Sequence, residues 1–228
     1  MHTPLWRQFP GYSDYAETLA AMEAHAGRMV DGLAAEEIWL VEHPPVITGG
    51  TSAEAADLLE PGRFPLHAVG RGGRFTYHGP GQRVIYPMLD LGSRGRDVRR
   101  YVTSLEAWAI AALADVGIEA GVSDLGTGIW VRSTSGLAKI GAIGVRVRRW
   151  ISFHGMAINV ATDLDHYSAI IPCGIQTNAV ARVADMKPEV TMARFDQALF
   201  NSLPVLLHSL SAREAPAIKT LEAASDCR

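Results

Sequence analysis

The spacing of apolar residues predicts two amphipathic helices in the first half of the chain. Over 15–29, apolar side chains recur every three or four positions, and Asp14 stands where it can cap the first turn. Over 98–113 the same spacing follows Asp97, and Gly117 suits the position just past a helix. We expect the apolar face of the first helix to pack on a sheet.

Runs of branched and aromatic residues predict the strands of that sheet. Residues 37–42 form such a run, and the prolines that follow His43 end it. Residues 140–147 and 151–160 predict a long hairpin whose turn lies near Trp150. The other expected elements are strands over 5–9, 64–69, 84–91 and 129–131, a helix over 191–208, and from 211 a loosely attached helix or a frayed tail.

The order of these elements predicts an α+β fold with a mixed sheet and packed helices. Strands and helices alternate without the regular strand–helix–strand repeat of a doubly wound α/β protein. The length of 228 residues is that of one full core, so we expect a single domain over 1–228.

Composition and charge exclude several classes of function. The net charge of −3 gives no reason to propose a nucleic-acid partner. No apolar run approaches the roughly 20 residues that span a membrane, and the N-terminus lacks the pattern of a secretory signal. The two cysteines, Cys173 and Cys227, make a poor disulfide framework, so we expect a reducing, cytoplasmic setting. The histidines lack metal-ligand spacing, and we expect no metal.

A glycine-rich segment, 71–82, is the first candidate for chemistry. It combines four glycines with Tyr77, His78 and two arginines, and glycines let backbone approach a ligand closely. It lacks the Gly-Lys-Ser/Thr ending of a phosphate loop, and a strand rather than a helix follows it. The segment is either a turn between strands or a ligand-binding loop.

Lys139 and Cys173 are the candidates for catalysis. Lys139 enters an apolar, glycine-spaced strand; most lysines are solvated, but a buried lysine amine can act as a general base. Cys173 stands between Pro172 and Gly174, either as a small buried hydrophobe or as a nucleophile on a tight turn. A nearby ammonium would favour the thiolate, so the two residues form a candidate dyad if they meet in space.

Five segments together resemble the octanoyl-[acyl-carrier-protein]–protein transferases of lipoate biosynthesis. They stand in the family's order between about Val41 and Ile175. The chain departs from the family over 47–50, where an Ile-Thr-Gly-Gly stretch replaces the usual Thr-Leu-Gly-Arg type of turn. The matching segments are EHPPV at 42–46, RGGRFTYHGPGQ at 71–82, the run over 139–147, FHGMAINV at 153–160 and IPCGI at 171–175.

The resemblance implies a fold shared with lipoate and biotin protein ligases, and it implies residue roles. Cys173 matches the acyl-accepting cysteine, and Lys139 matches the lysine that tunes it. Neither a metal nor a cofactor is implied. The residues implied to line the acyl site are Arg71, Gly72, Gly73, Arg74, Phe75, Thr76, Tyr77, His78, Ala142, Ile143, Gly144, Gly155, Met156 and Ala157.

The implied activity is transfer of an octanoyl group from octanoyl-acyl carrier protein through a thioester on Cys173. The acceptors would be lysines in the lipoyl domains of 2-oxoacid dehydrogenases and in the glycine cleavage H protein. An ATP-dependent lipoate–protein ligase is the alternative of the same fold, and a non-catalytic carrier with a merely buried Cys173 is the alternative of another class. Two arginine clusters would either dock acidic partners or be solvated surface: Arg94, Arg96, Arg99, Arg100, Arg146, Arg148 and Arg149.

Overall fold

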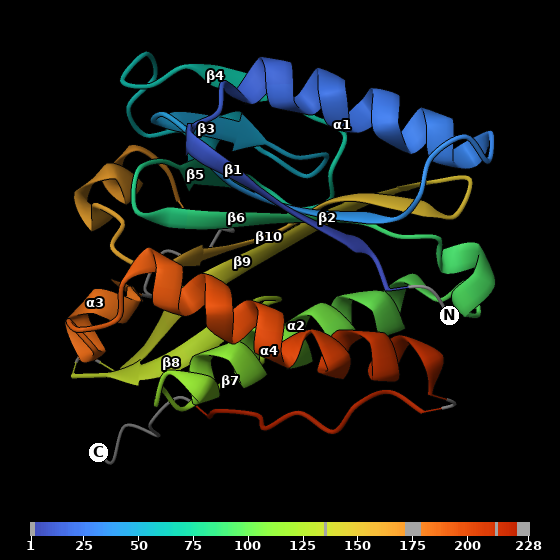
Figure 1. The fold of residues 1–228 in the computed structure, drawn as a ribbon. Helices are drawn as coiled ribbons and strands as arrows, with labels where there is room; N and C mark the ends of the chain where they lie inside the picture. The colour runs from blue at the N-terminus through green and yellow to red at the C-terminus, as the bar shows by residue number, and fades with distance from the viewer. Residues whose placement is uncertain (1–2, 135, 172–178, 213, 223–228) are drawn as a thin grey trace.

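The computed structural model describes residues 3–134, 136–171, 179–212 and 214–222. Most strands in these ranges join one large sheet, which runs diagonally through the molecule between two layers of helices (Figure 1). In spatial order its strands are β1 (Leu5–Tyr12), β2 (Glu37–Glu42), β6 (Gln82–Met88), β10 (Ile151–Asn159), β9 (Gly136–Arg148), β8 (Ile129–Ser133) and β7 (Ala120–Gly121), with the short β11 (Ala179–Val180) beside β9.

Strand directions confirm the predicted α+β class. β1 runs parallel to β2 and β11 runs parallel to β9, whereas the other neighbours in the large sheet are antiparallel. The predicted hairpin is the β9–β10 pair, and its turn contains Arg149 and Trp150, both at positive φ. The sheet is therefore mixed, as the sequence predicted.

A second, smaller sheet has the order β4 (Leu66–Ala68), β3 (Val46–Gly49) and β5 (Phe75–His78). The sequence predicted β4 with bounds of 64–69 but missed β3 and β5. Both missed strands are four residues long and buried throughout, so neither shows the alternation that marks a half-exposed strand. β5 also lies inside the glycine-rich segment, which is thus part strand and part loop.

Helices cover both faces of the large sheet. α1 (Tyr15–Val30) lies on one face with the small sheet, and α2 (Val98–Asp115) and α4 (Met192–Ser211) lie on the other (Figure 1). Asp14 and Asp97 accept hydrogen bonds from the first turns of α1 and α2, as predicted. The remaining helical segments are short: α3 (Val183–Met186), η1 (Ala55–Asp57), η2 (Leu91–Arg94) and η3 (Leu164–Ala169).

Because both faces are covered, the central strands are apolar on both sides. Ile38 and Leu40 of β2 belong to the core on the α2 and α4 side, whereas Trp39 and Val41 belong to the core on the α1 side. A strand buried on both faces gives a continuous apolar run, which is why the sequence predicted β2 with its observed bounds.

The C-terminal segment beyond α4 is extended where the structure describes it. The Val122 amide donates to the Lys219 carbonyl at 3.0 Å, and the Leu221 amide donates to the Val122 carbonyl at 2.7 Å. Leu221 is buried against Trp130 and Leu137. Residues 219–221 therefore lie along the β7 edge, whereas the sequence suggested a loosely attached helix or a frayed tail from 211. Residues 223–228, with Cys227, lie outside the described residues.

A buried ion pair ties α4 to the centre of the sheet. Arg83 of β6 donates from Nε and Nη2 to the two carboxylate oxygens of Asp196, at 2.7 and 2.9 Å. Gln8 of β1 adds a third hydrogen bond to Asp196 at 2.7 Å. Burial raises the pKa of the Asp196 carboxyl, and the charge of Arg83 opposes that rise. Three elements that are distant in sequence meet at this carboxylate.

We expect Asp196→Ala to lower the free energy of unfolding by about 3 kcal/mol or more, because it leaves the Arg83 guanidinium buried without its counterion. The control is Asp115→Ala, which removes the exposed ion pair to Arg194 and should cost under about 1 kcal/mol. Urea denaturation of both variants measures the difference. Equal losses would show that the Arg83–Asp196 pair is not a structural anchor.

Candidate active site

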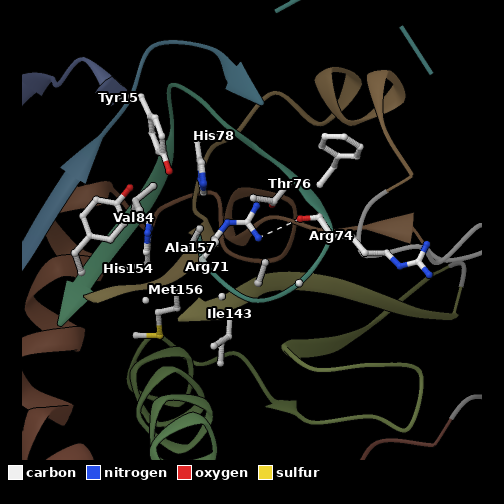
Figure 2. A pocket seen from close by; sticks show the side chains of 16 residues that line it. Tyr15, Arg71, Arg74, Thr76, His78, Val84, Ile143, His154, Met156 and Ala157 are labelled. Carbon is white, nitrogen blue, oxygen red and sulfur yellow. Dashed lines mark hydrogen bonds between the residues drawn. The ribbon is translucent and has the colours of Figure 1, made fainter. Parts of the chain in front are cut away.

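A pocket lies between the large sheet and the small sheet, and its empty space is about 480 Å³ when open solvent at the mouth is included (Figure 2). β9 and β10 provide its floor, and the 71–76 segment provides one wall. α1 and β6 close one end of the pocket. The predicted lining residues that the structure places here are Arg71, Gly73, Arg74, Phe75, Thr76, His78, Ala142, Ile143, Gly144, Gly155, Met156 and Ala157.

Two of the predicted lining residues lie outside this pocket. Tyr77 falls between Thr76 and His78 on β5, and successive side chains of a strand point to opposite faces. Its hydroxyl is 2.7 Å from His166 Nδ1, so its ring faces η3 instead. Gly72 contributes backbone: its amide donates to the Val145 carbonyl at 3.0 Å, which holds the glycine-rich segment against β9.

Ile143 and Met156 reach the pocket from the sheet, but their side chains point away from it. Figure 2 shows both side chains directed toward the green helix α2, on the far side of the strands from Arg71 and His78. Met156 belongs to the core on the α2 side, and Ile143 packs against that core. The floor of the pocket at these positions is therefore backbone.

Arg71 braces the glycine-rich segment against β3. Its guanidinium is buried and donates to the Thr48 carbonyl at 2.8 Å, the Thr48 hydroxyl at 2.7 Å and the Arg74 carbonyl at 3.1 Å. A Cβ on Gly50 would lie 2.3 Å from the Gly73 carbonyl oxygen and 2.8 Å from Arg71 Nη1. The glycine at position 50 thus makes room for this brace.

The sequence reasoning missed four lining residues: Tyr15, Val84, Tyr86 and His154. Tyr15 and Val84 had the spacing of ordinary core residues, and Tyr86 lies in an apolar strand, so no local signal marked them. His154 stood inside the FHGMAINV motif, which was a usable signal. Together with His78, these residues make the α1 end of the pocket aromatic and polar.

Hydrogen bonds fix most of the polar groups at this end. His43, just behind the pocket, has Nδ1 2.7 Å from the Ser13 carbonyl and Nε2 2.9 Å from the Tyr86 hydroxyl. The carbonyl can only accept, which assigns the proton to Nδ1 and makes Tyr86 the donor to Nε2. The His78 Nδ1–H likewise donates to Gln82 Oε1 at 2.6 Å.

Burial keeps these side chains neutral. It lowers the pKa of His78 to about 3, and the neighbouring His43 adds to the effect. It also lowers the pKa of His154 to about 3, and the charges of Arg71 and Arg146 lower that pKa further. Burial raises the pKa of Tyr15 to about 12. The α1 end of the pocket therefore offers neutral hydrogen-bonding groups at neutral pH.

Lys139 lies beside the opposite end of the pocket. Its side chain is buried, and its Nζ donates to the Thr127 carbonyl at 2.6 Å. The same Nζ lies 5.5 Å from the centroid of the Trp130 ring. It lines a small adjoining pocket that shares Thr76 and Ala142 with the larger one. The lysine predicted from sequence is thus next to the space predicted for the acyl chain.

Cys173 lies outside the described residues. The chain on either side of it is anchored. The Ile171 amide donates to the Asp57 carbonyl at 2.8 Å, and Val180 pairs with Lys139 in parallel register. The Ala181 amide then donates to the Lys139 carbonyl at 3.0 Å.

A buried polar network joins the two pockets. The Gln82 amide nitrogen lies 3.0 Å from both Asn159 Oδ1 and the Tyr167 hydroxyl, and Gln82 Oε1 holds His78. The Asn159 amide donates to the Ala181 carbonyl at 3.1 Å. The network therefore connects His78 at the larger pocket to the strand that pairs with Lys139.

Glu106 of α2 is a further residue that the sequence reasoning missed. Burial raises the pKa of its carboxyl, while a hydrogen bond from the Gly128 amide at 3.4 Å and the charge of Lys139 oppose the rise. An acidic residue among the buried positions of a predicted helix was the available signal. Glu106 places a carboxyl group on the side of Lys139 that faces α2.

Two other structural findings bear on function. Within residues 3–134, 136–171, 179–212 and 214–222, no group of three or more histidine, cysteine or acidic side chains is arranged to hold a metal ion. The helices in the same ranges are all too short or too polar to cross a membrane.

Comparison with known proteins gives a consistent family assignment. Residues 14–204 match the family described as lipoyl protein ligase A/B catalytic domain. An octanoyltransferase of Rhizorhabdus wittichii is 56% identical over 206 residues, covering 90% of this chain and 92% of that protein. An octanoyltransferase of Paracoccus denitrificans is 53% identical, covering 86% of this chain and 94% of that protein.

Solved structures show the same fold at low sequence identity. Lipoate-protein ligase A bound with ATP has a TM-score of 0.69 and 19% identity, covering 90% of this chain and 86% of that one. A bipartite lipoate protein ligase from Thermoplasma acidophilum, studied with its E2 lipoyl domain, has a TM-score of 0.65 and 17% identity, covering 91% of this chain and 85% of that one. These structures confirm the predicted lipoate-ligase-like fold.

The buried histidines predict that stability falls below pH 6.5. In the unfolded chain His78 and His154 titrate near 6.5, but their pKa in the folded protein is about 3. Between these values the unfolded state binds more protons, so stability is present above pH 6.5 and is lost as the pH falls. We expect a loss of about 1 kcal/mol for each histidine between pH 6.5 and 5.5.

Urea denaturation at pH 7.5, 6.5 and 5.5 measures this loss. His154→Asn should remove one histidine's share of the slope, whereas His208→Asn, at an exposed position on α4, should leave the slope unchanged. A pH-independent free energy of unfolding in the wild type would contradict the buried neutral state of these side chains.

Proposed function

The chain belongs to the family of the lipoyl protein ligase A/B catalytic domain, and we propose that it acts as an octanoyltransferase in protein lipoylation. Relatives above 50% identity that carry this name align with most of this chain and of their own length. The observation on this chain that carries the proposal is a narrow, backbone-floored pocket ending beside the buried amine of Lys139.

The proposed donor is octanoyl-acyl carrier protein, and the first step forms an acyl-enzyme. The Cys173 thiolate attacks the thioester carbonyl, and Lys139 takes the proton that the thiol gives up. The tetrahedral intermediate collapses with loss of the carrier thiolate, which receives the proton from Lys139. The octanoyl group is then a thioester of Cys173. The anchored flanks of 172–178, one of them on the Lys139 backbone, support this pairing.

In the second step the amine of a lipoyl-domain lysine attacks the Cys173 thioester. An amide bond forms, the Cys173 thiolate leaves, and Lys139 accepts the proton that the amine loses. Exchange between thioesters is near balance and conversion to an amide is downhill, so the reaction needs no nucleotide. The proposed acceptors are lipoyl domains of 2-oxoacid dehydrogenases and the glycine cleavage H protein.

The pocket favours an acyl chain of intermediate length. Burial of each methylene contributes roughly 0.8 kcal/mol, so octanoyl gains about 3 kcal/mol over butanoyl if its additional carbons are buried. The side chains of Ile143 and Met156 do not form a wall against longer chains, because both point toward α2 (Figure 2). The limit on longer chains has to come from the α1 end.

Only part of the predicted arginine clusters is available to dock acidic partners. Arg94 pairs with Glu36, and Arg100 donates to two backbone carbonyls, so both serve the fold. Arg148 and Arg149 are exposed beside Trp150, whose carbonyl accepts from the Leu91 amide. Arg96 lies 5.9 Å from the Trp150 ring at the same end of the molecule. These three arginines support a docking surface for an acidic carrier.

The decisive test is the intact mass of the protein after brief incubation with octanoyl-acyl carrier protein in the absence of ATP. We expect one added octanoyl group on the wild type, removed by hydroxylamine because a thioester is labile to it. Cys173→Ser should carry no hydroxylamine-labile adduct.

The other outcomes separate the alternatives. Modification of the acceptor without an enzyme adduct would mean direct transfer between the partners. Modification that requires ATP would favour the lipoate–protein ligase alternative. An unchanged activity in Cys173→Ala would remove the thioester intermediate from the mechanism.

A second prediction concerns the position of the Lys139 side chain. A Cβ on Gly128 would lie 2.5 Å from Lys139 Cε and 2.6 Å from the Gly141 carbonyl oxygen, so Gly128→Ala must displace the Lys139 side chain and the β9 backbone beside it. We expect kcat/KM for octanoyl transfer to fall roughly 100-fold, the cost of misplacing a reacting group by about 1 Å.

Gly136→Ala is the matched control for this prediction. Gly136 also has a positive φ, +110° against +135° at Gly128, but a Cβ there meets nothing within 4 Å. Both variants carry the backbone penalty of a side chain at positive φ, and Gly128→Ala alone disturbs Lys139. Equal kcat/KM in the two variants would argue against a role for the Lys139 position.

A further inference from the structure

His154 has a backbone conformation that is unusual for its place in a strand. It lies in β10 with φ of +58°, in the left-handed region that residues other than glycine seldom adopt. On the same strand, Phe153 and Ala157 belong to the core on the α1 side, and Met156 belongs to the core on the α2 side. Because side chains alternate along a strand, the side chain at 154 would be expected on the α2 side, together with Met156.

The left-handed backbone instead brings the imidazole to the α1 side, where the pocket lies. The ring stacks on Phe153 at 5.4 Å between centroids and meets Tyr86 edge-on at 6.3 Å. Both partners belong to the core that α1 covers. Backbone strain of this kind persists where the surroundings enforce it and is common at functional positions.

The imidazole also carries a buried atom that lacks a hydrogen bond. His154 is 2% exposed, and among the described residues none offers a hydrogen-bond partner to its Nε2. Most buried polar atoms in proteins are paired, so an orphaned one that lines a pocket points to a ligand atom or a water there. The nearby Tyr86 hydroxyl already donates to His43.

The position of His154 along the pocket fits the end of an eight-carbon chain. Thr76 and Ala142 mark the end that adjoins Lys139. His154 pairs with Val145, three residues beyond Ala142 on β9, which is about 10 Å along the strand. An extended octanoyl group spans about 9 Å from carbonyl carbon to methyl, given C–C bonds of about 1.5 Å. Its methyl would stop just short of the imidazole.

We propose that His154 sets which acyl-chain ends the pocket accepts, because its unpartnered nitrogen requires a hydrogen-bonding group at the level where an octanoyl chain ends. A water fills that role when the chain is octanoyl. A longer apolar chain displaces the water and leaves the nitrogen unpaired, so it is rejected. A chain that ends in a hydroxyl at this level replaces the water and is accepted. This inference rests on the proposed octanoyl transfer and adds its chain-end specificity.

The protonation state of the site agrees with this role. Burial and the charges of Arg71 and Arg146 keep the pKa of His154 far below neutral, so the ring is neutral in use. A neutral imidazole has one nitrogen that donates and one that accepts. A terminal hydroxyl both donates and accepts, so it satisfies Nε2 in either tautomer.

The test compares two acyl chains with the same number of non-hydrogen atoms, nonanoyl and 8-hydroxyoctanoyl, each as the carrier-protein thioester. They differ only in whether the last group is a methyl or a hydroxyl. We expect the wild type to use 8-hydroxyoctanoyl with a kcat/KM at least equal to that for nonanoyl. A pocket with an apolar end would instead disfavour the hydroxyl by about tenfold or more.

The ratio of kcat/KM for 8-hydroxyoctanoyl to kcat/KM for nonanoyl, measured in His154→Leu, identifies the residue responsible. We expect this ratio to shift toward nonanoyl by about tenfold or more, because the hydrogen bond to the hydroxyl is lost. His208→Leu, at an exposed position on α4, should keep the wild-type ratio. If His154→Leu does not fold, the wild-type ratio alone decides, and a tenfold preference for nonanoyl overturns the inference.

Octanoyl transfer by the wild type separates the two levels of the proposal. If no thioester is used, the proposed function fails. If octanoyl is transferred but His154→Leu leaves the ratio unchanged, only the role of His154 is overturned.

Discussion

The antiparallel pairing of β9 with β10 is the constraint on which the candidate site depends. Their register sets Ala142 opposite Ala157 and Gly144 opposite Gly155, so a patch of the sheet carries almost no side chains. The pocket is the space above that patch. The same two strands carry Lys139 toward one end and His154 toward the other, so one register fixes the floor, the reacting end and the far end together.

The small residues on this floor have packing roles as well as a role in making space. A Cβ on Gly155 would lie 2.2 Å from the Ile85 carbonyl oxygen, so this glycine lets β6 approach β10. A Cβ on Gly144 would lie 3.0 Å from both Arg71 Cδ and the Gly72 carbonyl oxygen. The backbone that packs closely at these glycines is therefore also the backbone that forms the pocket floor.

The electrostatics of the site follow from where its charges lie. The Arg71 guanidinium is held by carbonyl and hydroxyl oxygens, and its charge disfavours protonation of His78 and His154. At the other end, Lys139 lies against the Thr127 carbonyl and near Glu106. The Lys139 amine at one end and neutral imidazoles at the other suit a substrate with a polar reacting group and an apolar chain.

The sequence by itself determined the elements and the chemistry of single residues. Periodicity located the long helices and the β9–β10 hairpin, and the motifs selected Lys139 and most of the pocket lining, because these signals depend only on neighbours in the chain. Cys173 was selected in the same way and remains a prediction. The tertiary structure decided what depends on pairing between distant segments. The packing of α1 brought Tyr15 to the pocket and strand register brought Tyr86 there. Strand alternation removed Tyr77 from the pocket, and a positive φ turned His154 into it. No local pattern encodes such contacts, because they arise only when separate strands and helices pack on one another.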